Sequence, residues 1–217
     1  MAALHTDDPS RAGSLSLVGQ ALALDFANTA SGRGGAHGLD HMRAPEHVVD
    51  WAEHAGVVDG PTAAALRERI AAEHRCVAGL LPDALSLREA IHRAVAALAA
   101  GQGPDPADLA HLKTACARAI AAAELAPGAG DFRWTWPTDP PVAETVLGPI
   151  ALSAVGILRE GDLSRLKQCG GEHCGWVFFD LTKNRSRRWC DMAVCGNRTK
   201  ARRHRQRQAF SADDPAS

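Results

Sequence analysis

Four of the six cysteines in this chain of 217 residues occur as two pairs of equal spacing. Cys169 and Cys174 enclose four residues, Cys190 and Cys195 enclose four more, and 15 residues separate the pairs. Four thiolates are the donor set that a structural Zn²⁺ takes in a tetrahedron, and such a closed shell leaves no position for a catalytic water. The spacing therefore predicts one structural zinc ion bound by these four cysteines.

Two other interpretations of these cysteines are weaker. Redox-active disulfides usually have a C-x-x-C spacing, and His173 beside Cys174 could replace a cysteine only in a less simple geometry. No stretch reaches the roughly 20 apolar residues of a membrane span, and Asp7, Asp8 and Asp25 disfavour a secretory leader. We therefore expect a cytoplasmic protein without a membrane partner, where thiols stay reduced and favour metal over disulfides.

The charge of the chain is divided unevenly. Residues 1–158 contain 11 Lys/Arg and 18 Asp/Glu, whereas residues 159–209 contain 13 and 5. An acidic body with one basic end favours an anionic partner that contacts that end only. The residues expected to contact nucleic acid are Arg185, Arg187, Arg188, Arg198, Lys200, Arg202, Arg203, Arg205 and Arg207.

Charge alone does not separate DNA from RNA as the partner. A cationic helix beside an arginine-rich turn suits phosphate contacts and entry into the major groove of DNA. Trp176, Phe178, Phe179 and Trp189 could instead stack on the bases of RNA, although some of them must cover the metal. Anionic lipid fits less well, because the helix lacks a large apolar face.

Hydrophobic periodicity predicts a mostly α (α+β) fold. Apolar and small residues alternate over residues 15–29, which is a strand pattern. Residues 132–136 alternate large apolar with polar side chains, so we expect a second strand that could pair with the first and form a small β element. Helices are expected from Pro45 up to Gly56, from Pro61 with a break at 101–106, over 105–125 and over 142–158.

The segment with the paired cysteines predicts a small module of its own. Residues 176–179 form a strand that leads into a polar turn at 182–186, so we expect a hairpin there. Asp191 is a candidate N-cap for a following helix that continues to Gln208. Knuckle, hairpin and helix give a treble-clef-like zinc finger that needs its metal to fold. The predicted organisation is a disordered terminus at 1–14, a helical domain at 15–161, the finger at 162–209 and a disordered tail at 210–217.

Three short motifs surround the cysteines: Cys-Gly-Trp at 174–176, Asn-Arg-Ser-Arg-Arg-Trp-Cys at 184–190 and Met-Ala-Val-Cys-Gly-Asn-Arg at 192–198. Their order and spacing are similar to those of the CGNR zinc-finger family. Members resemble stress-induced transcriptional regulators. The resemblance, over roughly residues 165–207, implies a zinc site at the four paired cysteines and DNA binding by the finger.

The N-terminal part is similar to the ABATE domain that accompanies this finger. This looser resemblance is carried by residues 22–29, Leu-Ala-Leu-Asp-Phe-Ala-Asn-Thr, and by Pro45 to Gly56 with Trp51. The glycine-rich loop at residues 31–38 departs from the pattern. The resemblance implies a sensing or ligand-binding module, so a small-molecule effector is one expected partner.

The sequence leaves the roles of five further residues open. Asp25, Asn28 and Thr29 are either a turn and helix cap or the polar lining of a small ligand site. Gly196 allows close backbone approach beside a ligand, where N–H groups can hydrogen-bond sulfur. Asn197 could brace the knuckle by donating to a loop carbonyl.

Three classes of function remain in competition. The leading hypothesis is a transcriptional regulator that binds DNA at the nucleoid, with a homodimer made by the helical domain if its operator is palindromic. The second is an RNA-binding zinc module. The third is an enzyme in the N-terminal domain, but that domain shows no nucleophile–base pair or phosphate loop and its histidines are expected at the surface. We therefore expect no enzymatic activity.

Overall fold

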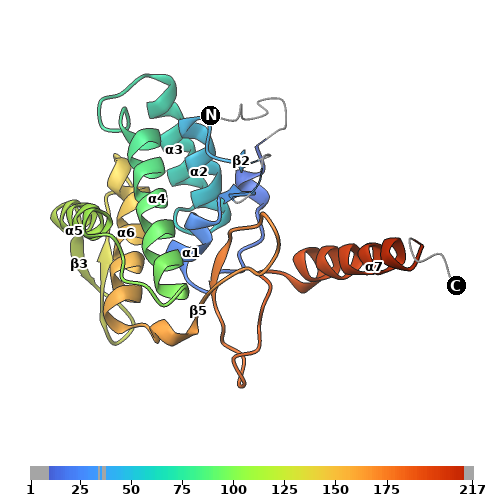
Figure 1. Ribbon diagram of the computed structural model, residues 1–217. Helices are drawn as coiled ribbons and strands as arrows, with labels where there is room; N and C mark the ends of the chain where they lie inside the picture. The colour runs from blue at the N-terminus through green and yellow to red at the C-terminus, as the bar shows by residue number, and fades with distance from the viewer. Residues whose placement is uncertain (1–9, 34, 36–37, 213–217) are drawn as a thin grey trace, which may run out of the picture.

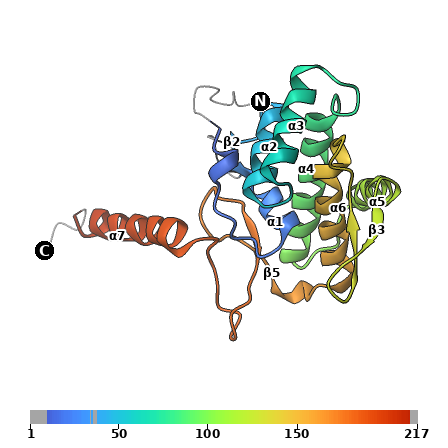
Figure 2. The ribbon, with the colours of Figure 1, turned by 180° about the vertical axis from the view of Figure 1, so that it is seen from behind.

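The computed structural model describes residues 10–33, 35 and 38–212. In chain order its helices are α1 (Leu22–Ala27), α2 (Pro45–His54), α3 (Gly60–Ala71), α4 (Leu80–Ala99), α5 (Pro106–Ala121), α6 (Ala143–Glu160) and α7 (Asn197–Ala212). The first six pack into one body, whereas α7 extends away from it, as both ribbon views show (Figures 1 and 2). This arrangement confirms the predicted mostly α fold with small β elements.

Three antiparallel pairs of strands accompany the described helices. They are β1 (Ala30–Ser31) with β2 (Leu39–Asp40), β3 (Glu124–Pro127) with β4 (Phe132–Thr135), and β5 (Leu166–Gln168) with β6 (Val177–Phe179). Single helical turns are η1 (Ala12–Ser14) and η2 (Leu163–Arg165), both 3₁₀, and the π-helical η3 (Met192–Gly196).

Helix α2 forms where the sequence predicts it. Pro45 lies in its first turn, where a missing N–H is not needed, and Gly56 follows its end with a φ of +71°. Trp51 is fully buried, and its ring packs on Phe26 of α1 with the ring centroids 5.0 Å apart. This aromatic contact joins the first two helices of the body.

The centre of the body is formed by α4 and α6. Leu87, Ile91 and Val95 of α4 recur at helical spacing and are at most 3% exposed, and they lie in one core with Val146 and Ile150 of α6. Both helices are long and rich in apolar residues. Even so, none of the helices in the described part of the chain is long and apolar enough to cross a membrane.

The strand predicted over residues 15–29 is wrong, because α1 occupies this segment. Ala23, Leu24, Phe26 and Ala27 are fully buried, and this i, i+1, i+3, i+4 pattern is that of one helix face. The alternation of larger residues concealed this pattern, since small alanines form half of the buried face. That face packs against α4 and α6.

The two other predicted strands exist but have different partners. Residues 132–135 form β4, which pairs with β3 immediately upstream and not with the N-terminal segment. A short connection closes at a lower entropic cost than a contact between distant segments. Likewise β6 pairs with β5, so the first cysteine pair lies in the turn of this hairpin and no hairpin forms over residues 176–186.

One hydrophobic core crosses the expected boundary after residue 161. Leu166 of β5 and Val177 of β6 are 3% and 0% exposed, and they belong to the same buried cluster as the core residues of α1, α4 and α6. The strands of the finger are therefore packed on the helical body, while Phe178 and three of the paired cysteines form a second, smaller buried cluster within the finger.

The ends of the chain are more ordered than the sequence predicts, as far as the structure describes them. Ala12 in η1 is only 1% exposed, so residues 10–14 are not a disordered terminus. Helix α7 includes residues 210–212, which correct the start of the expected tail. Residues 1–9 and 213–217 of the two expected disordered segments lie outside the described residues.

Candidate metal centre and nucleic-acid interface

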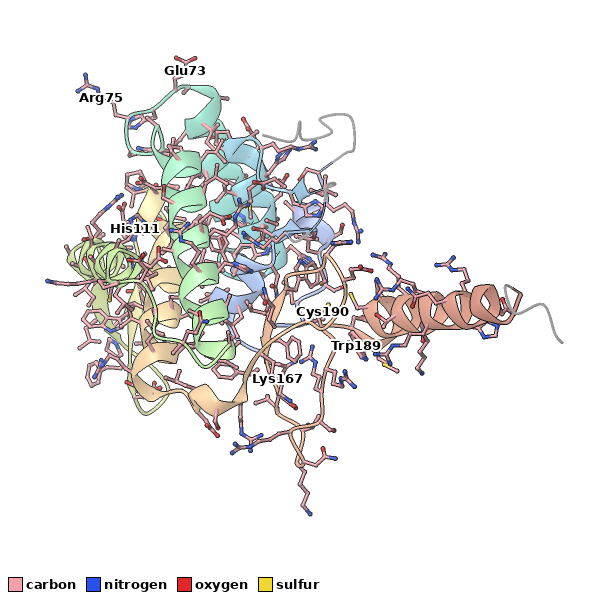
Figure 3. All side chains as sticks on the ribbon, viewed as in Figure 1. Glu73, Arg75, His111, Lys167, Trp189 and Cys190 are labelled. Carbon is pink, nitrogen blue, oxygen red and sulfur yellow. The ribbon has the colours of Figure 1, made fainter. Side chains whose placement is uncertain are left out.

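The four paired cysteines converge at the base of α7. Their sulfur atoms all lie within 4.8 Å of one another, and Sγ of Cys190 is 3.6 Å from Sγ of both Cys174 and Cys195. A tetrahedron with Zn–S distances of roughly 2.3 Å has S–S edges of about 3.8 Å. The donor set therefore fits one structural zinc ion, as the sequence predicts. Figure 3 labels Cys190 where the finger meets α7.

The first pair of cysteines is positioned by the turn between β5 and β6. The N–H of Cys169 donates to the carbonyl of Trp176 at 2.8 Å, which closes the turn around the pair. His173 and Gly175 have φ values of +65° and +74°, a left-handed conformation that glycine adopts without strain. The chain thus reverses sharply and brings Cys174 back beside Cys169.

The second pair is positioned by the start of the C-terminal helix. Oδ1 of Asp191 accepts a hydrogen bond from the N–H of Val194 at 3.0 Å, which confirms Asp191 as the N-cap. The π-helical turn η3 contains Cys195 and continues into α7. A displacement of α7 would therefore move Cys195, a metal ligand.

Among the four sulfurs, that of Cys169 has the surroundings that best stabilise a thiolate. Backbone N–H groups of Cys190 and Gly171 lie 3.2 and 3.4 Å from Sγ of Cys169. Hydrogen bonds from the thiols of Cys174 and Cys190 lower the pKa of Cys169, whereas the same sharing with Cys169 raises the pKa of Cys174 and of Cys190. A bound divalent ion is what allows all four sulfurs to be thiolates together.

Gly196 allows the expected close approach of the chain but makes no hydrogen bond to sulfur, and Asn197 does not have its expected role. The N–H of Gly196 donates to the carbonyl of Asp191 and not to a sulfur. Glycine is needed there for space, because a Cβ would collide with Sδ of Met192. Asn197 is exposed, and within the described residues its contacts are made by its backbone N–H, which caps η3. Bracing of the knuckle by its side chain is therefore not observed.

Arg187 holds the finger together. Its guanidinium donates to the carbonyls of Val18 at 2.9 Å and Cys190 at 2.6 Å. Its Cζ also lies 4.1 Å from the centroid of the Phe178 ring, a cation–π contact. A guanidinium with these partners is not available to a phosphate, which corrects the predicted role of Arg187 in nucleic-acid contact.

The other cations of the arginine-rich turn are more accessible. Arg185 is exposed but donates to Oγ of Ser164 at 2.8 Å and to Asp162 at 3.3 Å. Arg188 is exposed, and its Cζ lies 5.6 Å from the centroid of the Trp189 ring. Of the turn, Arg188 is therefore the residue best placed to contact an external anion.

Four of the cations of α7 are exposed to solvent. Arg198, Lys200, Arg203 and Arg205 are exposed, while Arg202 is half-buried and pairs with Glu172 in the turn of the first cysteine pair. Arg207 lies in α7, but its side chain is outside the described part of the structure. Because α7 extends away from the body (Figures 1 and 3), the four exposed side chains lie on a helix that projects into solvent.

The aromatic residues considered for base stacking are largely used by the fold. Phe178 is fully buried, and Trp189 packs beside it against the cysteine cluster. Trp176 donates from Nε1 to Oγ of Ser31 at 3.2 Å, and Phe179 packs on the core of the body. These contacts argue against the aromatic stacking that RNA recognition by this finger would need.

Asp25, Asn28 and Thr29 are engaged inside the protein. Asp25 accepts the N–H of Gly19 at 2.7 Å, and Oγ1 of Thr29 donates to the carbonyl of Phe26 at 2.8 Å. Asn28 and Thr29 are 2% and 0% exposed. These partners correspond to the structural alternative, and the predicted ligand site is not formed by these side chains.

Sequence reasoning missed an ion pair that orders the long loop of the finger. Nζ of Lys167 lies 2.6 Å from Oδ2 of Asp180, whose side chain is fully buried. Burial raises the pKa of Asp180, but Lys167 and the hydroxyl of Thr182 outweigh this effect and lower it. Oδ2 of Asp180 also accepts the N–H of Arg187 at 2.9 Å. The only sign of this ion pair in the sequence is that Asp180 directly follows the apolar residues 177–179.

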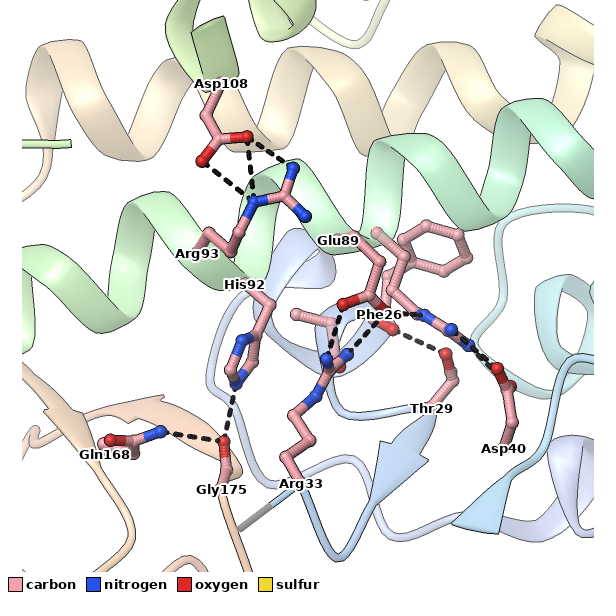
Figure 4. Close-up of polar contacts among 12 residues, drawn as sticks. Phe26, Thr29, Arg33, Asp40, Glu89, His92, Arg93, Asp108, Gln168 and Gly175 are labelled. Carbon is pink, nitrogen blue, oxygen red and sulfur yellow. Dashed lines mark hydrogen bonds and ion pairs between the residues drawn. The ribbon is translucent and has the colours of Figure 1, made fainter. Parts of the chain in front are cut away.

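A polar network between the body and the knuckle was also missed. His92 of α4 is 8% exposed, and its Nε2 lies 2.7 Å from the carbonyl of Gly175, beside a metal ligand (Figure 4). On the same helix, Arg88 binds Asp40 with two hydrogen bonds of 2.6 and 2.7 Å. The expectation that the histidines lie at the surface is wrong for His92, and also for His41, which is 2% exposed.

The comparisons with known proteins agree with this arrangement. Residues 165–208 match the family model of the CGNR zinc finger, which encloses all four cysteines and most of α7. Residues 20–161 match the ABATE family, described as "Putative stress-induced transcription regulator". No curated protein sequence matches the chain. Because the ABATE match covers more than half of the chain, the chain belongs to the ABATE family, and it carries a C-terminal CGNR zinc finger.

Proposed function

We propose that this protein is a transcription regulator that binds duplex DNA through α7 and Arg188. The observation that carries the proposal is a helix that extends from the body, exposes Arg198, Lys200, Arg203 and Arg205, and directly follows a turn that contains a ligand of the four-cysteine metal site. Lys and Arg side chains that replace the counterions of DNA supply sequence-independent affinity. The zinc ion would fix the direction of this helix relative to the body.

The charge of the rest of the chain supports contact through one end only. Residues 1–158 have an excess of acidic side chains, so the body should be repelled by a polyanion. Duplex DNA is favoured over RNA because Phe178 is buried and the other aromatic residues of the finger are half-buried against the fold. The proposed role is binding and not catalysis, since four thiolates close the metal shell. Such a regulator would act in the cytoplasm at the nucleoid.

Two features of the proposed regulator concern the body. A palindromic operator would require two copies, and the helical body would supply their interface. An effector bound by the body would be the stress signal that the family description implies. Both belong to the same proposal and are tested after DNA binding itself.

The proposal is tested by fluorescence anisotropy with a labelled pool of random duplex DNA over a series of salt concentrations. The first variant replaces Arg198, Lys200 and Arg203 with serine. A matched control replaces Arg75, Lys113 and Arg159, which are exposed cations of the body. Each phosphate contact that is lost should lower the slope of log affinity against log salt by about 0.9. The α7 variant should therefore lose two to three units of slope, and the control should lose none.

Three outcomes would contradict the proposal. Equal weakening by both triple variants would show that only net charge matters. Affinity without salt dependence would exclude phosphate contacts. Structured RNA that displaces the duplex at a much lower concentration would make the finger an RNA-binding module instead.

A further inference from the structure

We infer that Asn28 and His92 of the helical body are positioning residues for the zinc knuckle, the turn at residues 169–176 that contains the first cysteine pair. The finger therefore depends on contacts with the body to retain its metal. His92 contacts Gly175, directly after Cys174, and Asn28 contacts Val177, the first residue of β6. This inference deepens the proposed function, because it names what controls the direction of α7. Its test uses metal retention and needs no DNA.

Asn28 acts as a substitute for a neighbouring strand. Its Oδ1 accepts the N–H of Val177 at 2.8 Å, and its Nδ2 donates to the carbonyl of the same residue at 2.9 Å. An amide side chain that satisfies both backbone groups of one residue reproduces the contact of an adjacent β-strand. Both residues are almost fully buried, so loss of the side chain would leave two backbone groups unpaired away from water.

His92 holds the carbonyl of Gly175, two residues before Val177. Its Nε2 must carry the proton, because its partner 2.7 Å away is the carbonyl oxygen of Gly175. The second donor to this carbonyl is Nε2 of Gln168, at the longer distance of 3.4 Å. Burial lowers the pKa of His92, which keeps the ring neutral. Gly175 follows Cys174 directly, so this bond fixes the backbone of a metal ligand.

The surrounding contacts show that the knuckle is held from several directions. A Cβ on Gly175 would lie 2.7 Å from Cβ of Arg33, so the loop of the body touches the knuckle backbone. Arg33 is in turn fixed by Glu89 of α4 through hydrogen bonds of 2.6 and 3.0 Å (Figure 4). The N–H of Phe179 donates to the carbonyl of Gly19 at 3.0 Å. The knuckle thus has backbone and side-chain contacts with α1, α4 and their flanking loops.

This arrangement predicts how the body influences the metal. Zinc ligands keep their geometry through the groups that hold them, and losing such a group typically weakens metal binding about 10- to 100-fold. A change in the distance between α1 and α4 would therefore alter the knuckle first and then α7. The helical body in this scheme regulates the DNA-binding end without contacting DNA.

The test measures zinc loss from the full-length, zinc-loaded protein to an excess of a colorimetric chelator. The variants are Asn28→Ala, His92→Leu and the double variant, and His92→Gln is the rescue because it retains an N–H donor. Leu66→Ala is the matched control, since Leu66 is fully buried in α3, which packs on α2. Circular dichroism at the same temperature confirms that each protein retains its helices.

Zinc loss should be about 10- to 100-fold faster for Asn28→Ala and for His92→Leu, and close to wild type for His92→Gln. Leu66→Ala should lower the melting temperature but leave the rate of zinc loss unchanged. The Co²⁺-loaded variants should also show altered d–d absorption bands, which a general loss of stability would not produce. If Asn28→Ala does not fold, the comparison of His92→Leu with His92→Gln decides alone.

The inference would be overturned if the rate of zinc loss followed the melting temperature alone. Leu66→Ala would then lose zinc as fast as any other variant with the same melting temperature. The inference would also be overturned if His92→Leu and His92→Gln lost zinc at the wild-type rate. These results say nothing against DNA binding by α7. A protein that retains zinc as expected but ignores duplex DNA would refute the proposed function and leave this inference standing.

Discussion

Glu89 of α4 binds both terminal nitrogens of Arg33, with distances of 2.6 and 3.0 Å. Burial raises the pKa of Glu89, but the hydrogen bonds and charges of Arg33 and Arg88 outweigh this and lower it from 4.5 to about 2. A depressed pKa in the folded state stabilises the protein above the unfolded pKa, and this contribution is lost as the pH falls toward the folded value. The sensitive window is therefore between pH 4.5 and about pH 2.

Glu89→Gln should lower the free energy of unfolding at pH 7 by no more than about 3 kcal/mol. The difference in unfolding free energy between wild type and Glu89→Gln should shrink as the pH falls from 4.5 and vanish near pH 2. At that pH the carboxyl of Glu89 is protonated, so it is neutral like the glutamine that replaces it. Urea unfolding at several pH values measures this difference. Exposed Glu68→Gln in α3 is the control and should differ little from wild type throughout. A loss of unfolding free energy in Glu89→Gln that is the same at every pH would contradict the lowered pKa of Glu89.

Arg187 and Arg188 are neighbours that should respond differently to substitution. Arg187→Ala removes the bonds to Val18 and Cys190 and the contact with Phe178, so it should weaken zinc retention and lower the melting temperature. Arg188→Ala should leave both unchanged and reduce the salt slope of DNA binding by about 0.9. Thermal unfolding and anisotropy on the two variants separate these effects. A reversed pattern would show that Arg187 faces the nucleic acid.

Removal of zinc should open the long loop of the finger before the helical body. Without the metal, four crowded sulfurs cannot all be thiolates, and the loop at residues 183–188 loses its anchor at Cys190. Limited digestion with trypsin should therefore cut at 183–188 much faster after chelation. The body should resist digestion but melt at a lower temperature, because Leu166 and Val177 belong to its core. Equal cutting with and without zinc would contradict this expectation.

Two glycines of α6 should respond to alanine in opposite directions. Gly148 lies against the indole of Trp136, where a Cβ would collide with the ring, and Nε1 of that ring donates to the carbonyl of Ala119 at 2.9 Å. Gly156 has open space around it. Gly156→Ala should stabilise the protein by roughly 0.5–1 kcal/mol through helix propensity, while Gly148→Ala should destabilise it. Urea unfolding of the two variants compares them directly, and stabilisation by both would mean that Trp136 is not packed there.

The chemistry of the finger could be predicted because it depends on local sequence. The equal spacing of Cys169/Cys174 and Cys190/Cys195 and the N-cap at Asp191 fix which atoms can meet a metal within one short segment. Helix α2 was predictable for the same reason, since proline, periodic apolar residues and glycine follow each other along the chain. Local patterns of this kind need no partner from elsewhere in the fold.

The errors concern elements whose state depends on distant partners. Residues 22–27 alternate like a strand, but their alanines allow close packing on α4 and α6, and this burial favours the helix. Arg187 and Arg188 cannot be distinguished by sequence, but the guanidinium of Arg187 donates to the carbonyl of Val18, which is 169 residues away. His92 could not be distinguished from a surface histidine until Gly175 was placed beside it.

The amino-acid sequence by itself determined the mostly α fold, the four metal ligands and a cationic C-terminal helix. Only the tertiary structure decided that the finger shares a core with the body, that Asn28 completes the edge of β6, and that some arginines serve the fold while others face solvent. The physical reason is that ligand spacing and helix periodicity are encoded over a few residues. The desolvation of a charge or a backbone amide depends instead on chain segments that meet only after folding.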